Sequence, residues 1–406
     1  MNILMFSQYF FPERFLINDI SKELVERGNK VTVVTGVPNY PSGIVEEKYK
    51  NNRIPEEMIN GVRVIRCPIV PRGNSKIQLL VNYFSYMIKA NKRTKKLKDQ
   101  FDVVYIYQLT PILVAYPAVK FAQKENLPLV CYCLDLAPLS GIGFVNKIHP
   151  LMKLYTRFSR WAYNQCDHIA VTSKSFISYI NEVHGYSLEK MSYIPQHASE
   201  ELITADLKKK HDTIVKLYYA GNLGNGPKLE NVIYAAKGLI NRNVDNFEID
   251  FVGSGSAKEQ LIMLSNSLGT SKVVKFLDPV PMEKMPEVYK DADALIVTLK
   301  KGQITVPGKV QAYMATGKPI IASMDGSGYD LIQEVGCGIC VRAEDPDGLS
   351  GIMEQYINHP ELYDECGENG KRYFLDNMTL KIHVDKLEMT LHNVINQYYE
   401  DPKNEC

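Results

Sequence analysis

A glycine-rich turn in the second half of the chain has the composition of an anion-binding site. It follows an apolar run and carries three glycines and a lysine, Gly221-Asn222-Leu223-Gly224-Asn225-Gly226-Pro227-Lys228. Glycines at a strand-to-helix turn let backbone N–H groups approach a phosphate at the positive end of the helix. Lys228 would begin that helix, where a cation opposes the helix dipole, which suggests an anion between them. A simple tight turn is the alternative.

Two further turns have the same potential. Pro307-Gly308-Lys309 follows an expected strand end and opens a predicted helix that runs to Gly317, so its N–H groups and lysine form a second candidate anion site. An ordinary crossover would have the same pattern. Gly253-Ser254-Gly255 also joins a strand to a helix, a weak signal that a sharp turn alone explains. The candidate ligand-binding set in this half, which the resemblance described below assigns to a nucleotide, is Gly221, Asn222, Gly224, Lys228, Gly253, Gly255, Val280, Pro307, Gly308 and Lys309.

Polar residues also follow strands in the first half of the chain. Asp135 comes just after the apolar run Leu127–Cys133, where it faces a ligand or caps the next helix. Glu13 ends the loop Gln8–Glu13, and Asn39 and Tyr40 lie in the Pro/Gly-rich loop 36–43. These three residues are the candidate acceptor-side set, and a packed loop with exposed polar residues is the alternative.

No metal or cofactor is predicted. Asp291-Ala-Asp293 resembles a metal-binding pair, but it precedes a strand, which favours helix capping or a surface role. Cys337 and Cys340 have the spacing of half a zinc site, but no histidine cluster joins them, so buried thiols are favoured.

Predicted strands alternate with amphipathic helices along the whole chain. This pattern predicts an α/β fold with doubly wound parallel sheets, whose ligands bind at the carboxyl ends of the strands. The predicted strands are Ile3–Ser7, Val31–Thr35, Val62–Arg66, Val103–Tyr107, Leu127–Cys133, His168–Thr172, Val215–Ala220, Phe247–Val252, Val273–Leu277, Ala294–Leu299, Pro319–Ser323 and Gly338–Val341.

A length of 406 residues favours two domains. The polar stretch Gln196–Asp212 interrupts the alternation and is the expected boundary. The prediction is two Rossmann-like domains facing each other across a cleft, residues 1–197 and residues 198–385; the resemblance described below implies an acceptor- and membrane-facing role for the first and nucleotide-sugar binding for the second. Residues 386–406 are expected to form a C-terminal helix and tail that cross back to the first domain.

The net charge of +1 conceals an asymmetry between the halves. Residues 1–200 hold 25 Lys and Arg against 16 Asp and Glu, and the remainder holds 22 against 30. Two segments in the first half, Ile77–Lys98 and Phe144–Trp161, are free of acidic residues and combine apolar or aromatic side chains with Lys and Arg. Such segments suit an anionic lipid surface. Nucleic acid would not explain the long aliphatic stretch, and burial of these helices is the alternative.

No run of about 20 apolar residues is present, and the N-terminus lacks the pattern of a signal peptide. We therefore expect a cytoplasmic protein that lies peripherally on the inner face of the cell membrane.

Taken together, these segments resemble glycosyltransferase family 4, over nearly the whole chain. The residues that carry the resemblance are Gln8–Glu13, Thr35–Gly43, Tyr219–Gly224, Val306–Lys309 and Tyr313–Pro319. They look closest to the bacterial O-antigen and colanic-acid branch that includes N-acetyl-L-fucosamine transferases. The resemblance implies a GT-B fold, a metal-independent reaction that retains the anomeric configuration, and often an acceptor linked to undecaprenyl diphosphate.

The chain departs from the family at several positions. The two glutamates of the family, seven residues apart, would fall on Ile304 and Ala312, and the arginine of its phosphate-binding Arg/Lys pair would fall on Asn222, while the lysine matches Lys228. The common segment Arg-Asp-Leu-Trp-Pro-Glu is here Leu134-Asp-Leu-Ala-Pro-Leu139, which keeps Asp135 and Pro138. These changes leave the identity of the donor sugar open.

The resulting hypothesis is the transfer of a hexose-type unit from a UDP-sugar to a lipid-linked saccharide. Lys228, Lys309 and the turn amides would stabilise the charge that develops on the diphosphate, and Asp135 would orient or deprotonate the acceptor hydroxyl. Two alternatives remain: a sugar-nucleotide epimerase on the same fold, and a degenerate transferase that serves as a partner subunit in polysaccharide assembly.

Overall fold

The protein was analysed as a computed structural model that describes residues 1–73, 75–139, 150–204 and 213–401. The chain divides into two compact units. Unit 1 comprises Met1–Ile194 and His383–Cys406, and unit 2 comprises Pro195–Ile382. The boundary thus follows Ile194, three residues before the predicted one, and the chain returns to unit 1 within its last helix. Phe144 and the other residues from 140 to 149 lie outside the described part.

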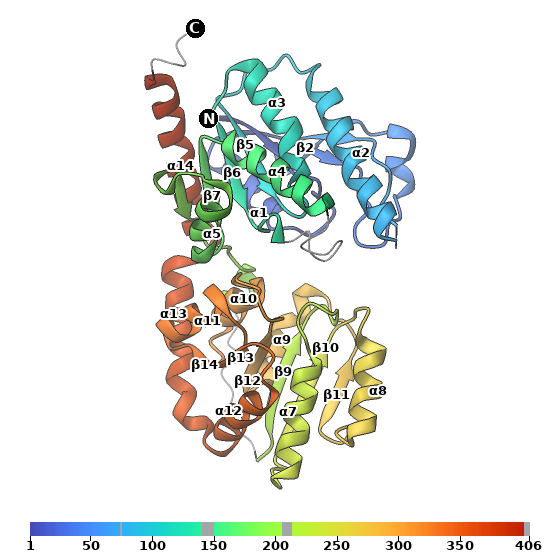
Figure 1. The fold of residues 1–406 in the computed structure, drawn as a ribbon, viewed down its shortest axis with the longest axis vertical. Coiled ribbons are helices and arrows are strands. Elements are labelled where there is room, and N and C mark those ends of the chain that lie inside the picture. Colours follow the sequence, from blue (N-terminus) through green and yellow to red (C-terminus); the bar gives the residue numbers. More distant parts are fainter. Residues whose placement is uncertain (74, 140–149, 205–212, 402–406) are drawn as a thin grey trace. The chain divides into compact units, whose positions relative to one another are not determined.

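Unit 1 is built on an eight-stranded sheet with the order β3-β4-β2-β1-β5-β6-β7-β8 (Figure 1). Only β3 runs antiparallel to its neighbour, β4. The strands are β1 (Asn2–Phe6), β2 (Lys30–Gly36), β3 (Glu56–Ile59), β4 (Val62–Cys67), β5 (Val103–Gln108), β6 (Leu129–Cys133), β7 (His168–Val171) and β8 (Met191–Tyr193).

Helices cover both faces of this sheet. The helices are α1 (Ile17–Glu26), α2 (Lys76–Thr94), α3 (Ala115–Glu125), α4 (Pro150–Asn164), α5 (Lys174–His184) and α14 (Leu380–Glu400), with short 3-10 turns η1 (Glu47–Asn52), η2 (Ile112–Val114) and η4 (Leu188–Lys190). Helices α2 to α5 pack one beside the next, and right-handed crossovers place α1 on the opposite face. Helix α14 lies beside α1. Arg27, at the C-terminal end of α1, forms ion pairs with Asp385 and Glu388 of α14 at 2.6 and 2.9 Å.

Unit 2 has a six-stranded, fully parallel sheet with the order β11-β10-β9-β12-β13-β14. The strands are β9 (Val215–Ala220), β10 (Phe247–Val252), β11 (Val274–Leu277), β12 (Ala294–Thr298), β13 (Ile320–Ser323) and β14 (Gly338–Val341). The helices are α6 (Glu200–Thr204), α7 (Glu230–Asn241), α8 (Lys258–Leu268), α9 (Met285–Asp291), α10 (Gly308–Thr316), α11 (Gly326–Val335), α12 (Pro346–Asn358) and α13 (Asp364–Asn377), with η5 (Met282–Lys284) and η6 (Pro360–Tyr363).

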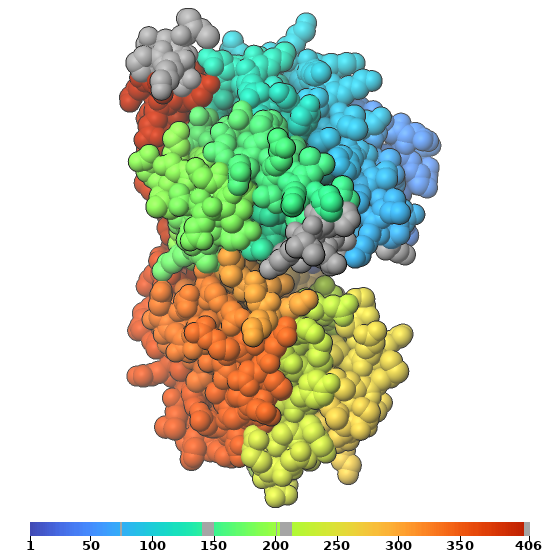
Figure 2. Space-filling view, viewed as in Figure 1, coloured from blue at the N-terminus to red at the C-terminus, as the bar shows by residue number. Residues whose placement is uncertain are grey.

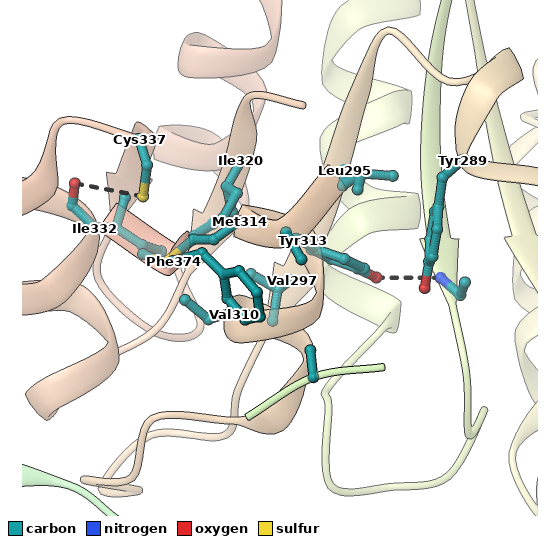
Figure 3. Close-up of a cluster of buried hydrophobic side chains, with 14 of the residues drawn as sticks. Tyr289, Leu295, Val297, Val310, Tyr313, Met314, Ile320, Ile332, Cys337 and Phe374 are labelled. Carbon is teal, nitrogen blue, oxygen red and sulfur yellow. Dashed lines mark hydrogen bonds between the residues drawn. The ribbon is translucent and has the colours of Figure 1, made fainter. Parts of the chain in front are cut away.

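The central strands β12 and β13 of unit 2 are almost entirely apolar and buried on both sides because helices cover both faces of the sheet. Neighbouring residues of one strand enter different core clusters: Tyr218 packs in one, and Leu217 and Tyr219 pack in the other. Figure 3 shows part of the first cluster, in which Tyr313 of α10 lies between the sheet and Tyr289. A helix as buried as α10 is held in a fixed position at the end of the sheet.

The structure also corrects the predicted elements. It adds two strands that the apolar pattern did not indicate: β3, which is short and half polar, and the three-residue β8. The polar stretch after Gln196 contains helix α6, whose Leu202 is buried in the core of unit 2. The strand expected just before Pro307 ends at Thr298, so residues 299–307 form a loop. Within the described ranges, no helix is both long and apolar enough to cross a membrane.

Candidate functional site

Each sheet reverses its winding direction at one place. In unit 1 this point lies between β1 and β5, and in unit 2 it lies between β9 and β12. Ligands of doubly wound sheets bind beyond the carboxyl ends of the strands at such a point. The residues that follow β9 and β12, and separately those that follow β1, β5 and β6, are therefore the first to consider.

In unit 2 the turns after β9 and β10 contact each other directly through their backbones. The N–H of Gly221 donates to Val252 O at 2.9 Å, and the N–H of Leu223 donates to Ser254 O at 2.8 Å. Gly221 and Gly253 have φ of +135° and +149°, a region that favours glycine. A Cβ at Gly253 would overlap the carbonyl oxygen of Gly221. The glycines are therefore explained by the close approach of two turns as well as by a ligand.

Lys309 reaches this pair of turns from helix α10. Its Nζ lies against Gly221, so closely that a Cβ at Gly221 would overlap it, and 4.9 Å from the centre of the Tyr219 ring. The hydroxyl of Tyr313 accepts a hydrogen bond from the N–H of Ala220 at 3.3 Å, which fixes α10 to the end of β9 (Figure 3). The first turn of α10 and the Gly221 turn thus form one site.

The electrostatics of this site favour an anion. Burial lowers the pKa of the Lys309 ammonium to about 8, and no carboxylate among the described residues pairs with it. The N–H groups of Gly308 and Lys309 open α10, where helix geometry provides them with no acceptor. A half-buried cation beside free N–H groups is suited to bind phosphate oxygens.

Lys228 follows the same glycine-rich turn, but its ammonium is paired with a carboxylate. Its Nζ pairs with Glu230 at 3.1 Å, which raises its pKa, and about a third of its side chain (31%) is exposed. The anion inferred at the start of α7 is therefore supplied by the chain itself, as Glu230 in the first turn. This contact ranks Lys309 above Lys228 as a phosphate ligand.

The remaining residues of the predicted nucleotide set differ in their surroundings. Asn222 is exposed, with its carbonyl accepting from the Tyr219 hydroxyl at 2.9 Å, and its amide lies beside Gly224. Val280, in the loop after β11, is partly buried against the core of unit 2. Ala312 packs against the same core, and the backbone of Ile304 lies against Gly326.

In unit 1, Asp135 fixes the turn that follows β5. Its Oδ2 accepts from the N–H and the hydroxyl of Thr110, at 2.8 and 2.9 Å. The carboxylate is partly buried, and its other oxygen makes no hydrogen bond to the described residues. Asp135 thus has a structural role and one oxygen that remains available to a ligand.

Glu13 and Asn39 are used to build the loop after β2. The buried Glu13 carboxylate accepts from the N–H groups of Asn39 and Tyr40, at 2.6 and 2.5 Å, and burial raises its pKa. The Asn39 side chain is buried and accepts from the N–H of Arg72 at 2.9 Å. Of the three predicted acceptor-side residues, only Tyr40 presents an exposed side chain, with 44% of its surface accessible.

Three residues near the predicted acceptor-side residues were missed from the sequence: Arg72 and Tyr83 near Tyr40, and Thr110 beside Asp135. The guanidinium of Arg72 lies 4.7 Å from the centre of the Tyr40 ring and is half-buried, and no carboxylate among the described residues pairs with it. Thr110 follows a predicted strand, so the rule that favours strand-ending loops would have found it. Arg72 follows no strand directly, and only the fold brings it to this edge.

Within the described residues, no group of three or more His, Cys, Asp or Glu could hold a metal ion. Asp291 accepts from Lys216 and from the Tyr218 hydroxyl, at 2.8 and 2.6 Å, which gives it a structural role. Cys337 is buried and donates to Ile332 O (Figure 3), and burial raises the pKa of its thiol to about 12.

Two family models match the chain, one for each half. The model for Glycosyltransferase Family 4 matches residues 16–197, and the model for glycosyl transferases group 1 matches residues 200–373. The Escherichia coli (strain K12) protein WcaI, whose name describes a glycosyl transferase of colanic acid biosynthesis, is 24% identical over 397 residues, which cover 89% of this chain and 93% of its own.

The chain is a glycosyltransferase of family 4. Solved structures share its fold. Sucrose-phosphate synthase from Thermosynechococcus elongatus superposes with a TM-score of 0.79 at 14% identity, over 98% of this chain and 99% of its own. HepE of Anabaena, in complex with UDP, superposes with a TM-score of 0.70 at 14% identity, over 97% of this chain and 100% of its own. The fold of this glycosyltransferase is GT-B, as the alternation of strands and helices and the resemblance had predicted.

The contact between the glycine turns predicts a difference between two glycine substitutions. In Gly255→Ala the new Cβ would overlap the Leu223 carbonyl, whereas in Gly226→Ala it meets nothing within 4 Å. Overpacking costs about 1–3 kcal/mol. We expect Gly255→Ala to lower the thermal unfolding midpoint of the transferase by several degrees and Gly226→Ala to leave it unchanged or slightly raised. Equal midpoints for both variants would contradict this account of the turns.

Proposed function

We propose that this glycosyltransferase moves a sugar from a UDP-sugar to a lipid-linked saccharide acceptor, with retention of configuration, in the synthesis of a bacterial surface polysaccharide. The family membership supports a nucleotide-sugar donor. The UDP complex of HepE supports UDP as its nucleotide, and the name of WcaI supports a polysaccharide pathway. We further propose undecaprenyl diphosphate as the lipid carrier and a reaction that requires no metal.

The observation that carries the donor assignment is the unpaired ammonium of Lys309 at the Gly221 turn. Cleavage of the bond between the anomeric carbon and the diphosphate leaves additional negative charge on the phosphate oxygens. A fixed cation and the N–H groups at the start of α10 stabilise that charge as it develops. Lys228 can turn from Glu230 toward the same phosphates, at the cost of an exposed ion pair.

Asp135 is the proposed acceptor-side residue of the reaction. Thr110 holds one carboxylate oxygen, which leaves the other to accept a hydrogen bond from the hydroxyl that attacks the donor. Such an interaction orients the hydroxyl and takes up its proton as the new bond forms. Asp135 therefore acts on the rate of transfer and has no role in binding UDP.

We also propose that α2 rests on the inner leaflet of the membrane. The helix exposes an apolar stripe of Ile77, Val81, Phe84 and Ile88, and Ile77 has 74% of its surface accessible. The spacing of four, three and four residues places these side chains on one face of the helix. Exposed lysines follow at positions 89, 92, 95 and 96. An apolar stripe followed by lysines favours insertion into an anionic interface.

Binding of UDP tests the donor site. We expect Lys309→Ala to weaken UDP binding at least tenfold, since a charge-assisted contact contributes about 1.5–3 kcal/mol. Lys228→Ala serves as the control and should weaken binding less, because Lys228 is exposed and already paired. Isothermal titration calorimetry with UDP and ADP measures both effects. UDP affinity unchanged in Lys309→Ala would remove this residue from the site.

The lowered pKa of Lys309 adds a pH dependence to the same measurement. The ammonium binds phosphate and the free amine does not, so UDP affinity should fall about twofold from pH 7 to 8 and be about tenfold weaker at pH 9 than at pH 7. The terminal phosphate of UDP, with its second pKa of about 6, does not titrate in this range. In Lys309→Arg the charge persists, and the dependence should disappear.

Replacement of Asp135 separates catalysis from structure. Asp135→Asn keeps an oxygen that can accept from Thr110, and it should reduce the rate of UDP release in the presence of a bacterial lipid extract about 100-fold or more while leaving UDP affinity unchanged. Thr110→Val removes the hydroxyl donor and serves as the structural control. A rate within twofold of wild type, together with a lowered unfolding midpoint, would assign Asp135 a structural role only.

Co-sedimentation with anionic liposomes tests the membrane face. The variant with Lys89, Lys92, Lys95 and Lys96 replaced by Ser should lose roughly 4 kcal/mol of attraction and remain in the supernatant. Arg93 is left in place because it lies 4.0 Å from Glu56. The matched control replaces four exposed lysines elsewhere in unit 1, Lys22, Lys30, Lys174 and Lys190, and should sediment like the wild type. Equal sedimentation of both variants would show that α2 is not the membrane face.

A further inference from the structure

An apolar cavity of about 500 Å³ lies between α2 and α4 in unit 1. Leu80, Phe84 and Met87 line it from α2, at the spacing of one helical face, and Leu154 and Phe158 line it from α4. Leu113 of η2 contributes to the wall between the two helices. Both helices lie on the same face of unit 1 (Figure 2). A cavity of this size and composition is a binding site for a hydrocarbon group.

Two of the residues that line the cavity carry hydroxyl groups close to charged side chains. Thr110 lines it and donates two hydrogen bonds to the Asp135 carboxylate, at 2.8 and 2.9 Å. Tyr83 also lines the cavity and lies within electrostatic range of Arg72 and Asp135, whose charges act on the pKa of its hydroxyl in opposite directions. The carboxylate proposed to act on the acceptor is therefore bonded to one residue that lines the cavity, and a cation acts on another.

Arg72 is held in place for an anionic group. Its backbone N–H donates to the buried Asn39 side chain, and its guanidinium stacks on the Tyr40 ring. No carboxylate in the described part of the chain neutralises it. An arginine that is positioned by its backbone and free of a counter-charge is suited to bind a phosphate through two parallel hydrogen bonds.

We infer that the cavity holds the lipid chain of the acceptor, with the lipid phosphate on Arg72 and the acceptor end beside Asp135. The inference rests on the proposed function and names the class of acceptor: a single hydrocarbon chain that ends in a phosphate or diphosphate. A half-open apolar cavity with one cation and one carboxylate close to its lining residues fits such a molecule better than a bilayer surface, which would need only an exposed apolar stripe. Asn39 and Glu13, which build the loop, are positioning residues for Arg72.

Binding of farnesyl phosphate to the full-length protein tests the inference. The protein is first saturated with UDP so that the donor site is filled. The one tryptophan of the sequence, Trp161, lies 5.3 Å from the cavity-lining Phe158 (ring centres), so its fluorescence reports occupancy. We expect farnesyl phosphate to change this fluorescence saturably and inorganic phosphate to have no effect. Farnesol should bind more weakly than farnesyl phosphate.

Three variants assign the two ends of the ligand. Met87→Gln places an unpaired amide in the cavity and should weaken farnesyl phosphate binding at least tenfold. Arg72→Gln should weaken farnesyl phosphate at least tenfold and leave farnesol affinity unchanged. Ile88→Gln is the matched control, because Ile88 belongs to the exposed stripe of α2 and does not line the cavity. It should reduce liposome binding without changing farnesyl phosphate affinity.

Several outcomes would overturn the inference. These are no fluorescence or calorimetric response to farnesyl phosphate up to about 1 mM, equal affinity in wild type and Met87→Gln, or equal competition by a two-chain phosphatidic acid. The last result would assign the cavity to general membrane binding. UDP affinity, measured on the same preparations, separates the two proposals. If the wild-type protein binds UDP but not farnesyl phosphate, only the assignment of the cavity is refuted. If the wild-type protein does not bind UDP, the proposed donor site is refuted.

Discussion

The candidate donor site of this glycosyltransferase depends on an ammonium group that the fold partly buries and that no carboxylate of the described residues neutralises. Burial of Lys309 lowers its pKa to about 8, which shows that the folded protein disfavours its charged form. A contact with the Tyr219 ring offsets only part of that cost. A phosphate at the Gly221 turn would offset the rest of the free-energy cost of burying the charged ammonium. That offset would contribute to the affinity for phosphate. The surrounding structure serves to keep this group in position.

Three features hold Lys309 against the turn. The glycines allow the turns after β9 and β10 to pack backbone against backbone, which leaves space for the ammonium beside Gly221. The Tyr313 hydroxyl fixes α10 to the end of β9, and the core of unit 2 surrounds the rest of the helix. A side chain at Gly221 would occupy the position of the ammonium. The glycines are thus required first for the packing of the two turns. They affect ligand binding indirectly, because this packing leaves the space that the Lys309 ammonium occupies.

Much of the fold and part of the site could be predicted from the sequence, for a physical reason. Strands of a parallel sheet that helices cover on both faces are mostly apolar, so β9, β10 and β14 were found with their correct limits, although β9 and β10 also carry charged residues. Strand β3 was missed because its solvent-facing glutamates interrupt the apolar pattern. Lys309 was found from its place in a Pro-Gly-Lys turn, but its rank above Lys228 depends on Glu230 and on Gly221. These contacts are properties of the packing, which spacing along the chain does not reveal.

The same limit applies to the predicted acceptor-side residues, whose surroundings in the fold could not be derived from the sequence. Glu13 and Asn39 are polar residues in loops that follow strands, which favours a binding role. In the fold, however, both side chains are buried and accept hydrogen bonds from backbone N–H groups. Their effect is to hold Tyr40 and Arg72 at the surface of unit 1.

A comparable shift occurs in unit 2, where the resemblance to family 4 would place an arginine at Asn222. Here a cation reaches the neighbouring Gly221 from α10 instead. An arginine at that place would stay charged at every physiological pH, whereas a buried lysine titrates near neutrality. A positive charge thus remains beside the turn without that arginine, and it depends on the ligand, because an anion that binds there also restores the proton.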